Sequence, residues 1–140
     1  MKAALLLALR ASTGALLIIW GLIKAVEPSR SIRVSEGLYG GALSAEALQT
    51  PLGVAEIALG ALVILGLFRR IVYPLQAVVL VFGALTLWKY ILDPLGAWLL
   101  TFETRQYLFF PSSTVAVASL ILLAFRSEDT LTLDRLIARK

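Results

Sequence analysis

Residues 51–92, PLGVAEIALGALVILGLFRRIVYPLQAVVLVFGALTLWKYIL, decide how this chain folds. The stretch contains two apolar runs, 51–68 and 71–92, and each is close to the roughly 20 residues that an α-helix needs to cross a membrane. Only Arg69 and Arg70 separate the two runs. The pattern therefore predicts two membrane-spanning helices that are joined by a very short turn and lie antiparallel as a tight hairpin.

Two further apolar runs, 3–23 and 107–125, flank this stretch and are also long enough to cross a membrane. Of the 140 residues, 59% are hydrophobic, whereas soluble domains have roughly 45–50%. The run 3–23 exceeds the core of about 7–15 apolar residues that is typical of a secretory signal, so we expect it to stay as a membrane helix. The predicted fold is an all-α, integral membrane four-helix bundle over 1–126, followed by a tail over 127–140.

Three polar segments connect or follow these spans. In the long connection 24–50 we expect a short interfacial helix over Ser44–Gln49, with Ser44 as its N-cap and Pro51 in the first turn of the next span. The stretch 95–110 mixes aromatic and charged residues, which is typical of a segment at the membrane interface. In the tail, apolar and cationic residues recur with helical spacing. This spacing predicts a short amphipathic helix on the membrane surface, formed by Leu133, Leu136 and Ile137 opposite Arg135, Arg139 and Lys140.

The distribution of cations favours one orientation in the membrane. Seven lie at the end that carries both termini and the turn between the second and third spans: Lys2, Arg69, Arg70, Arg126, Arg135, Arg139 and Lys140. Five lie at the other end: Lys24, Arg30, Arg33, Lys89 and Arg105. Because cytoplasmic loops carry an excess of Lys and Arg, we expect both termini and the tail to be cytoplasmic.

The composition excludes several kinds of chemistry. The chain has no His, no Cys and one Met, so the usual ligands of haem, iron–sulfur clusters and copper are missing. Without Cys there is no thiol chemistry. The net charge of +4 is spread along the edges of apolar runs, which differs from the single basic patch of a nucleic-acid-binding protein. We therefore expect no metal site, no intrinsic cofactor, no catalytic residue and no nucleic-acid partner.

Charged residues inside the predicted spans are the strongest functional signal, because a charge at the centre of a membrane helix costs about 2.5–3.5 kcal/mol. Glu56 has a short side chain, so we expect it to pair with Lys24, which lies at nearly the same depth. Arg10 lies about 12 Å from Glu56 in depth, and the sequence leaves open whether it pairs or extends to the headgroups. The predicted buried polar cluster comprises Arg10, Lys24, Glu56, Lys89, Tyr90, Asp93 and Arg105.

Small residues follow one face of each of the first two spans, in the series Arg10, Gly14, Leu17, Gly21, Lys24 and the series Gly53, Glu56, Gly60. Small residues let helices approach closely in lipid, so we interpret these faces as packing surfaces. Trp20, Trp88 and Trp98 all map near the predicted outer face, where Trp collects at the membrane interface. Trp20, Trp88 and Tyr90 are also the candidate contacts of a bound quinone or lipid.

These residues carry a resemblance to a known family. Through Leu9-Arg10, Gly14, Trp20-Gly21, Lys24, Gly53, Glu56, Gly60, Leu67-Phe68-Arg69-Arg70 and the ending Leu133-Asp134-Arg135-Leu136-Ile137-Ala138-Arg139, the chain resembles the DoxX family of small four-helix membrane proteins. The resemblance implies a bacterial or archaeal cytoplasmic-membrane protein associated with respiratory or oxidative-stress machinery. Its relatives include a subunit linked to thiosulfate oxidation with quinone reduction. Arg10, Lys24 and Glu56 would be the shared polar residues.

The expected function is that of a non-catalytic accessory subunit, which packs against a larger membrane oxidoreductase and shapes a quinone or lipid site, or which forms a homo-oligomer. One alternative is a quinone-reactive subunit in which Glu56 relays protons while Lys24, Tyr90 or Trp88 holds the quinone. A second alternative is a small proton or anion carrier lined by Arg10 and Glu56. The three functions predict that different proteins and lipids co-purify with the chain from its native membrane.

Overall fold

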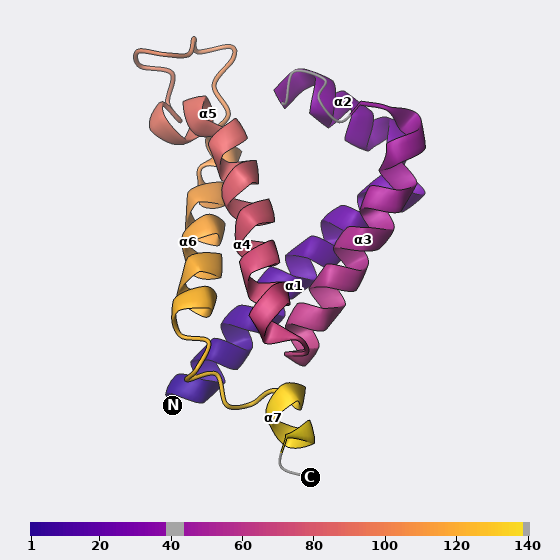
Figure 1. Cartoon of the computed structure of the whole chain (residues 1–140). Helices are drawn as coiled ribbons and strands as arrows, with labels where there is room; N and C mark the ends of the chain where they lie inside the picture. The colour runs from indigo at the N-terminus through magenta and orange to yellow at the C-terminus, as the bar shows by residue number, and fades with distance from the viewer. Residues whose placement is uncertain (39–43, 139–140) are drawn as a thin grey trace.

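The computed structural model describes residues 1–38 and 44–138, and every regular element within these residues is a helix (Figure 1). In chain order the elements are α1 (Lys2–Val26), α2 (Pro28–Leu38), α3 (Glu46–Leu65), α4 (Arg69–Thr86), α5 (Trp88–Leu92), the short 3₁₀ helix η1 (Tyr107–Phe109), α6 (Pro111–Ala124) and α7 (Leu133–Ile137). Four of the helical segments are long and apolar enough to cross a membrane: α1, α3, α4 and the continuous stretch Tyr107–Ala124. This finding confirms the predicted number of spans.

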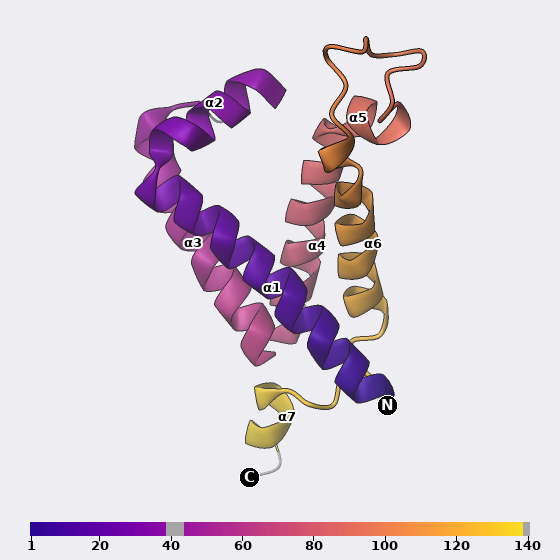
Figure 2. The same ribbon diagram turned by 180° about the vertical axis from the view of Figure 1, so that it is seen from behind.

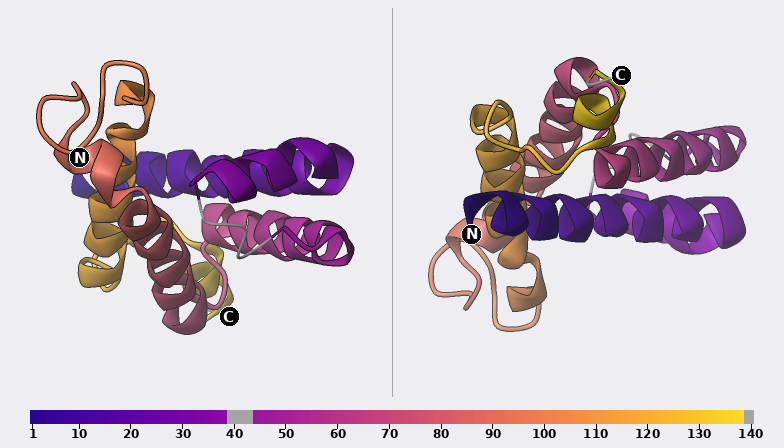
Figure 3. Two further views of the ribbon diagram at one scale, coloured as in Figure 1. Left: turned by 90° about the horizontal axis from the view of Figure 1, so that it is seen from above. Right: turned by 90° about the horizontal axis from the view of Figure 1, so that it is seen from below.

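The helices α1 and α3 pack antiparallel along their length, and Figure 3 shows them side by side from above and from below. Glycines on both helices face the partner backbone at two levels. A Cβ built on Gly60 would lie 2.5 Å from the carbonyl oxygen of Gly14, and one built on Gly21 would lie 2.5 Å from the carbonyl oxygen of Gly53. No side chain fits in this space, so the predicted small-residue faces hold the two helices together.

The helices α4 and α6 form the second pair. The two pairs meet at one end of the molecule, which holds Met1, the turn Gly66–Phe68 and α7, and which we call the base. From there they diverge towards the opposite end, which carries α2 and α5 (Figures 1 and 2). We call this the open end.

The predicted tight hairpin of the second and third spans is wrong. The helices α3 and α4 follow each other directly through the turn Gly66–Phe68, yet α3 packs along α1 and α4 packs along α6. Between membrane helices, close packing rather than chain proximity decides which pair forms. The glycine faces of α1 and α3 allow a closer approach than the apolar but bulkier neighbours along the chain.

The core lies where the two pairs meet near the base. Leu17 of α1, Val63 of α3, Tyr73 of α4 and Leu122 of α6 are fully buried there. All four long helices therefore contribute to one apolar core, which fixes the base and leaves the open end free to diverge.

Two element boundaries differ from the predictions. The second span begins at Glu46 with Ala45 as its N-cap, so Ser44–Gln49 is not a separate helix and Ser44 caps nothing. Pro51, predicted in the first turn of the span, is the sixth residue of α3, where it removes one hydrogen bond of the helix. The connection instead contains α2, and residues 39–43 lie outside the described part of the chain.

The predicted third span 71–92 is divided in two. The hydroxyl of Thr86 donates to the carbonyl oxygen of Gly83 at 2.7 Å, and the N–H of Leu87 then bonds to Ala84 instead of Gly83. This competition for a helical carbonyl ends α4 at Thr86, and α5 begins after it. In the predicted tail helix, α7 covers Leu133–Ile137, while Arg139 and Lys140 lie outside the described residues.

Candidate functional site

A cavity of about 290 Å³ lies between the two helix pairs towards the open end, and we call it the groove. Its wall comes from α1, α2 and α3 on one side and from α4, η1 and α6 on the other. Trp20, Phe82 and Phe109 contribute aromatic rings. Lys24 and Glu56 are the only charged residues among the described residues that line it. The groove is thus a mainly apolar space whose wall has one pair of charged side chains as its main polar feature.

That polar feature is the predicted pair of Lys24 and Glu56, which the structure confirms. The ammonium nitrogen of Lys24 donates to both carboxylate oxygens of Glu56, at 2.6 Å and 2.7 Å. Each side chain is 18% exposed. The close approach of α1 and α3 at Gly21 and Gly53 brings the two residues together, since both lie one turn from these glycines.

The groove suits an apolar group that carries a hydrogen-bonding group beside it. The ammonium group of Lys24 can donate to a carbonyl or phosphate oxygen, and the carboxylate of Glu56 can accept from a hydroxyl group. Ser31 and Ser112 add hydroxyl groups to the wall from α2 and α6. An apolar lining with a few polar groups is typical of sites that bind small molecules.

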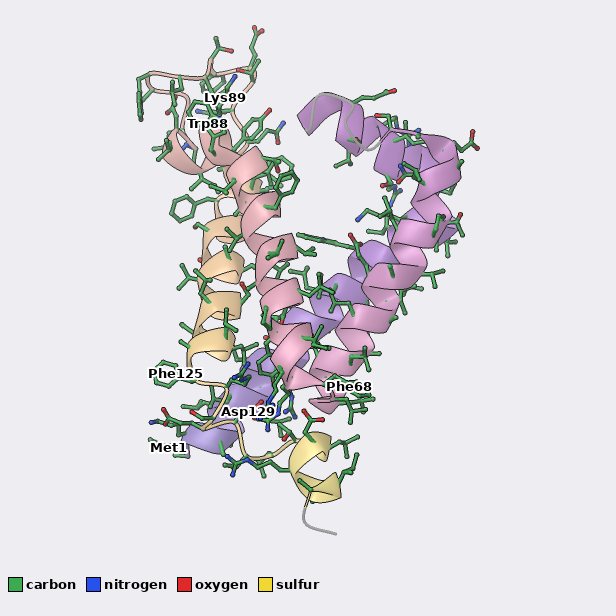
Figure 4. All side chains as sticks on the ribbon, in the orientation of Figure 1. Met1, Phe68, Trp88, Lys89, Phe125 and Asp129 are labelled. Atoms are coloured by element: carbon green, nitrogen blue, oxygen red, sulfur yellow. The ribbon has the colours of Figure 1, made fainter. Side chains whose placement is uncertain are left out.

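Arg10 lies at the base, apart from the groove, and it is paired. It is 2% exposed and donates from Nη1 to Asp129 at 3.0 Å and from Nη2 to the carbonyl oxygen of Leu131 at 2.7 Å. The hydroxyl of Tyr73 donates to the same carboxylate oxygen of Asp129 at 2.5 Å. Figure 4 shows Asp129 near Met1 and Phe68, far from Trp88 and Lys89. This network joins α1, α4 and the segment after α6, and it answers the question that the sequence left open for Arg10.

Asp129 and Tyr73 are not among the residues predicted from the sequence. Asp129 lies only a few residues beyond the fourth span, at the same end of the molecule as Arg10. An unpaired arginine in one span and an acid just past the end of another could have indicated the pair. The signal is ambiguous because Glu128 is adjacent and pairs instead with Lys2.

A second contact attaches the tail to the base. The carboxylate of Asp134 accepts hydrogen bonds from the backbone N–H groups of Phe68 and Arg69, both at 3.0 Å, and from the Arg69 side chain at 3.4 Å. Arg69 also donates to the carbonyl oxygens of Arg126 and Asp129. Burial raises the pKa of Asp134, but the bonds from Arg69 and Phe68 outweigh it and hold the pKa below its usual value.

The other predicted site residues lie at the open end, on the α4/α6 side. Asp93 is buried and accepts hydrogen bonds from the four backbone N–H groups of residues 97–100 at 2.6–2.9 Å. Burial raises the pKa of Asp93, yet these bonds hold it below its usual value. The remaining residues make local contacts: Tyr90 with the ring of Phe109, Lys89 with the ring of Trp88, and Arg105 with the ring of Phe102 and the carbonyl oxygen of Leu95.

The structure therefore divides the predicted cluster into three places. Lys24 and Glu56 lie in the groove, Arg10 at the base, and Lys89, Tyr90, Asp93 and Arg105 beyond the end of α4. Of the candidate quinone or lipid contacts, Trp20 lines the groove, while Trp88 and Tyr90 are not part of its lining. Within the described residues, no three Asp or Glu side chains come together as a metal site.

Comparisons of the chain with protein-family models, with curated proteins and with solved structures find no match. The resemblance to the DoxX family therefore stays a prediction, and the functional argument rests on the groove.

Proposed function

We propose that this chain is a non-catalytic membrane protein that holds a quinone or lipid in the groove, and that it does so as an accessory subunit of a larger membrane oxidoreductase. The observation that supports this proposal is the groove itself, an apolar cavity whose wall contains the ion pair of Lys24 and Glu56. The apolar body of such a molecule would replace lipid against Trp20 and Phe82. Its polar end would lie beside the ion pair, which offers both a donor and an acceptor.

Fluorescence of Trp20 provides a direct test. The chain has three Trp residues, and replacing Trp88 and Trp98 by Phe leaves Trp20 as the only Trp, whose emission can be excited selectively over that of Tyr. A short-chain quinone that enters the groove should quench this emission in a saturable way. The variant Gly83→Phe should abolish saturable quenching, because Gly83 lines the groove and a Cβ there meets no atom within 4 Å.

Val78→Phe is the matched control for this experiment, because Val78 is exposed on the same helix and does not line the groove. In this variant the quinone should quench the emission of Trp20 as it does in the parent protein. Equal quenching of Gly83→Phe and Val78→Phe would contradict binding in the groove. If extracts of the purified protein contain no quinone, and Gly83→Phe loses a lipid that Val78→Phe retains, that lipid is the occupant of the groove.

Glu56 lines the groove, and this observation also favours a second candidate function, a quinone-reactive subunit in which Glu56 relays protons to a quinone while an electron donor reduces that quinone. The two functions predict different outcomes for Glu56→Gln. A binding subunit should keep quinone binding and show no turnover with an added electron donor before or after the change. A reactive subunit should turn over, and Glu56→Gln should abolish the turnover.

The accessory role is supported by the resemblance to the DoxX family, and purification from the native membrane in mild detergent tests it. A larger oxidoreductase should accompany the chain, and deletion after Asp134 should weaken that association, because it removes the exposed side chains of Leu136 and Ile137 and keeps Arg10 paired with Asp129. Recovery of the chain alone at full yield would contradict the proposal.

We also propose that the base faces the cytoplasm of a bacterial or archaeal cell, because more cations lie at the base than at the open end. The chain has no Cys, so single cysteines report their own position. Ser29 and Ser127 are exposed at opposite ends. An impermeant maleimide should label Ser29→Cys in intact cells and Ser127→Cys only after permeabilisation. The reverse pattern would overturn this orientation.

A further inference from the structure

A second cavity of about 410 Å³ lies at the base, between the C-terminal end of α3 and the segment that leads into α7. We call it the tail cavity. Arg10, Ile64 and Leu65 line one side of it, and residues 130–133 with Leu136 line the other. Gly66 makes room for this arrangement, because a Cβ there would lie 2.5 Å from Nη1 of Arg10 and 2.8 Å from the side chain of Thr132.

Two buried polar groups in the lining have no partner among the described residues. Arg10 and Thr132 are each 2% exposed. Arg10 uses both Nη atoms in hydrogen bonds, but its Nε–H has no acceptor, and the hydroxyl of Thr132 has no partner. Buried polar groups in proteins are nearly always hydrogen-bonded. Because a guanidinium group can only donate, the complementary group must present an acceptor oxygen.

The net charge of the base favours an anion, and Arg10 is the one charged residue among the described residues that line the tail cavity. Within the described residues, six cationic side chains lie at this end, and three acidic ones: Lys2, Arg10, Arg69, Arg70, Arg126 and Arg135 against Glu128, Asp129 and Asp134. Asp129 also has an unpartnered buried oxygen, Oδ1, but Asp129 does not line the cavity. Its other oxygen already binds Arg10 and Tyr73, so a ligand at Nε of Arg10 leaves that network in place.

The rim of the tail cavity is largely apolar. Leu65, Leu131 and Leu136 line it and are exposed. The cavity therefore combines buried donors, an excess of positive charge and an apolar margin. A molecule that matches all three is amphiphilic and carries an anionic group with free oxygens, and cationic segments at membrane surfaces attract such lipids.

We propose that the tail cavity binds one anionic phospholipid. A phosphate oxygen accepts hydrogen bonds from Nε of Arg10 and from the hydroxyl of Thr132, while the acyl chains lie against Leu65, Leu131 and Leu136. This site is distinct from the groove, and its occupation does not depend on the function proposed for the groove.

Native mass spectrometry of the detergent-solubilised full chain tests the proposal, with phosphatidylglycerol, phosphatidylcholine and inorganic phosphate as probes. One phosphatidylglycerol should bind per chain, and phosphatidylcholine at least tenfold more weakly. Thr132→Val removes the hydroxyl while keeping the side-chain shape, and it should weaken phosphatidylglycerol binding about fivefold, as expected for one hydrogen bond. Thr114→Val, on the exposed surface of α6, is the matched control and should not change the affinity.

The exposed rim residue Leu136 provides a second variant that leaves the buried donors untouched. Leu136→Gln should weaken binding of the phospholipid. Equal affinity for the two lipids, or equal affinity of Thr132→Val and Thr114→Val, would overturn the proposal. It would also be overturned if inorganic phosphate bound with the same dependence on Thr132 while phosphatidylglycerol did not.

Discussion

Removing one partner of the buried pair of Arg10 and Asp129 should destabilise the protein more than removing one partner of any other ion pair of the described residues. Both side chains are almost fully buried, at 2% and 0% exposure, and the two charges are 3.0 Å apart. At an effective dielectric constant of about 20, unit charges at this distance attract by about 5–6 kcal/mol. Removing one partner of a buried pair typically costs about 3–5 kcal/mol, because the remaining charge is left uncompensated.

The substitution Asp129→Asn isolates this effect. Asn has the shape of Asp, and its carbonyl oxygen can still accept a hydrogen bond from Tyr73 or Arg10, so the main change is the lost negative charge. For a chain of this length, 1 kcal/mol corresponds to about 3 °C in Tm. We therefore expect Asp129→Asn to lower the Tm by about 10–15 °C in a thermal-unfolding assay in detergent.

The adjacent residue Glu128 is the matched control. It forms an ion pair with Lys2, but these side chains are 40% and 65% exposed. Exposed pairs contribute about 0–1 kcal/mol, so Glu128→Gln should shift the Tm by no more than about 3 °C. The double variant Arg10→Met/Asp129→Asn should recover part of the loss of Asp129→Asn. Equal shifts for Asp129→Asn and Glu128→Gln, or a double variant as unstable as the sum of its single variants, would refute the reasoning.

Three further predictions concern other contacts of the fold. Glu56→Gln and Lys24→Met should each lower the Tm in detergent, and the double variant should recover part of the loss; simple additivity would argue against energetic coupling in the groove. Gly60→Ala should lower the Tm, because the new Cβ would lie 2.5 Å from a backbone oxygen of α1. A Cβ at Gly83 meets no atom within 4 Å, so Gly83→Ala should raise stability by up to about 1 kcal/mol. The opposite order of stabilities would contradict the packing of α1 against α3. Because the pKa of Asp134 is lower in the folded protein, its stabilising contribution is complete above the unfolded value of about 4 and is lost as the pH falls below it. Limited proteolysis of the tail should increase in that acidic range, and Asp134→Asn should show the same sensitivity at pH 7, while unchanged cleavage would count against this attachment.

The pairing of Lys24 with Glu56 could be predicted from the sequence, because both lie on glycine-lined faces and at similar depth. The pairing of Arg10 with Asp129 could not. Asp129 follows the fourth span, and its distance along the chain from Arg10 is too great for any local spacing rule to connect the two. The four hydrogen bonds that the Asp93 carboxylate accepts could not be predicted from the sequence either, because they depend on how residues 97–100 turn back around the carboxylate.

The sequence by itself determined the number of membrane-spanning helices and their approximate bounds. Hydrophobic length is a local property, and a run of about 20 apolar residues can be counted without knowing its neighbours. Only the tertiary structure decided which helices pair, where the groove lies and what neutralises Arg10. Spans that are apolar on nearly every side carry little information about which side faces a partner. In lipid the partner is chosen by the close fit of small residues and by hydrogen bonds between distant segments, and these exist only once the helices are packed.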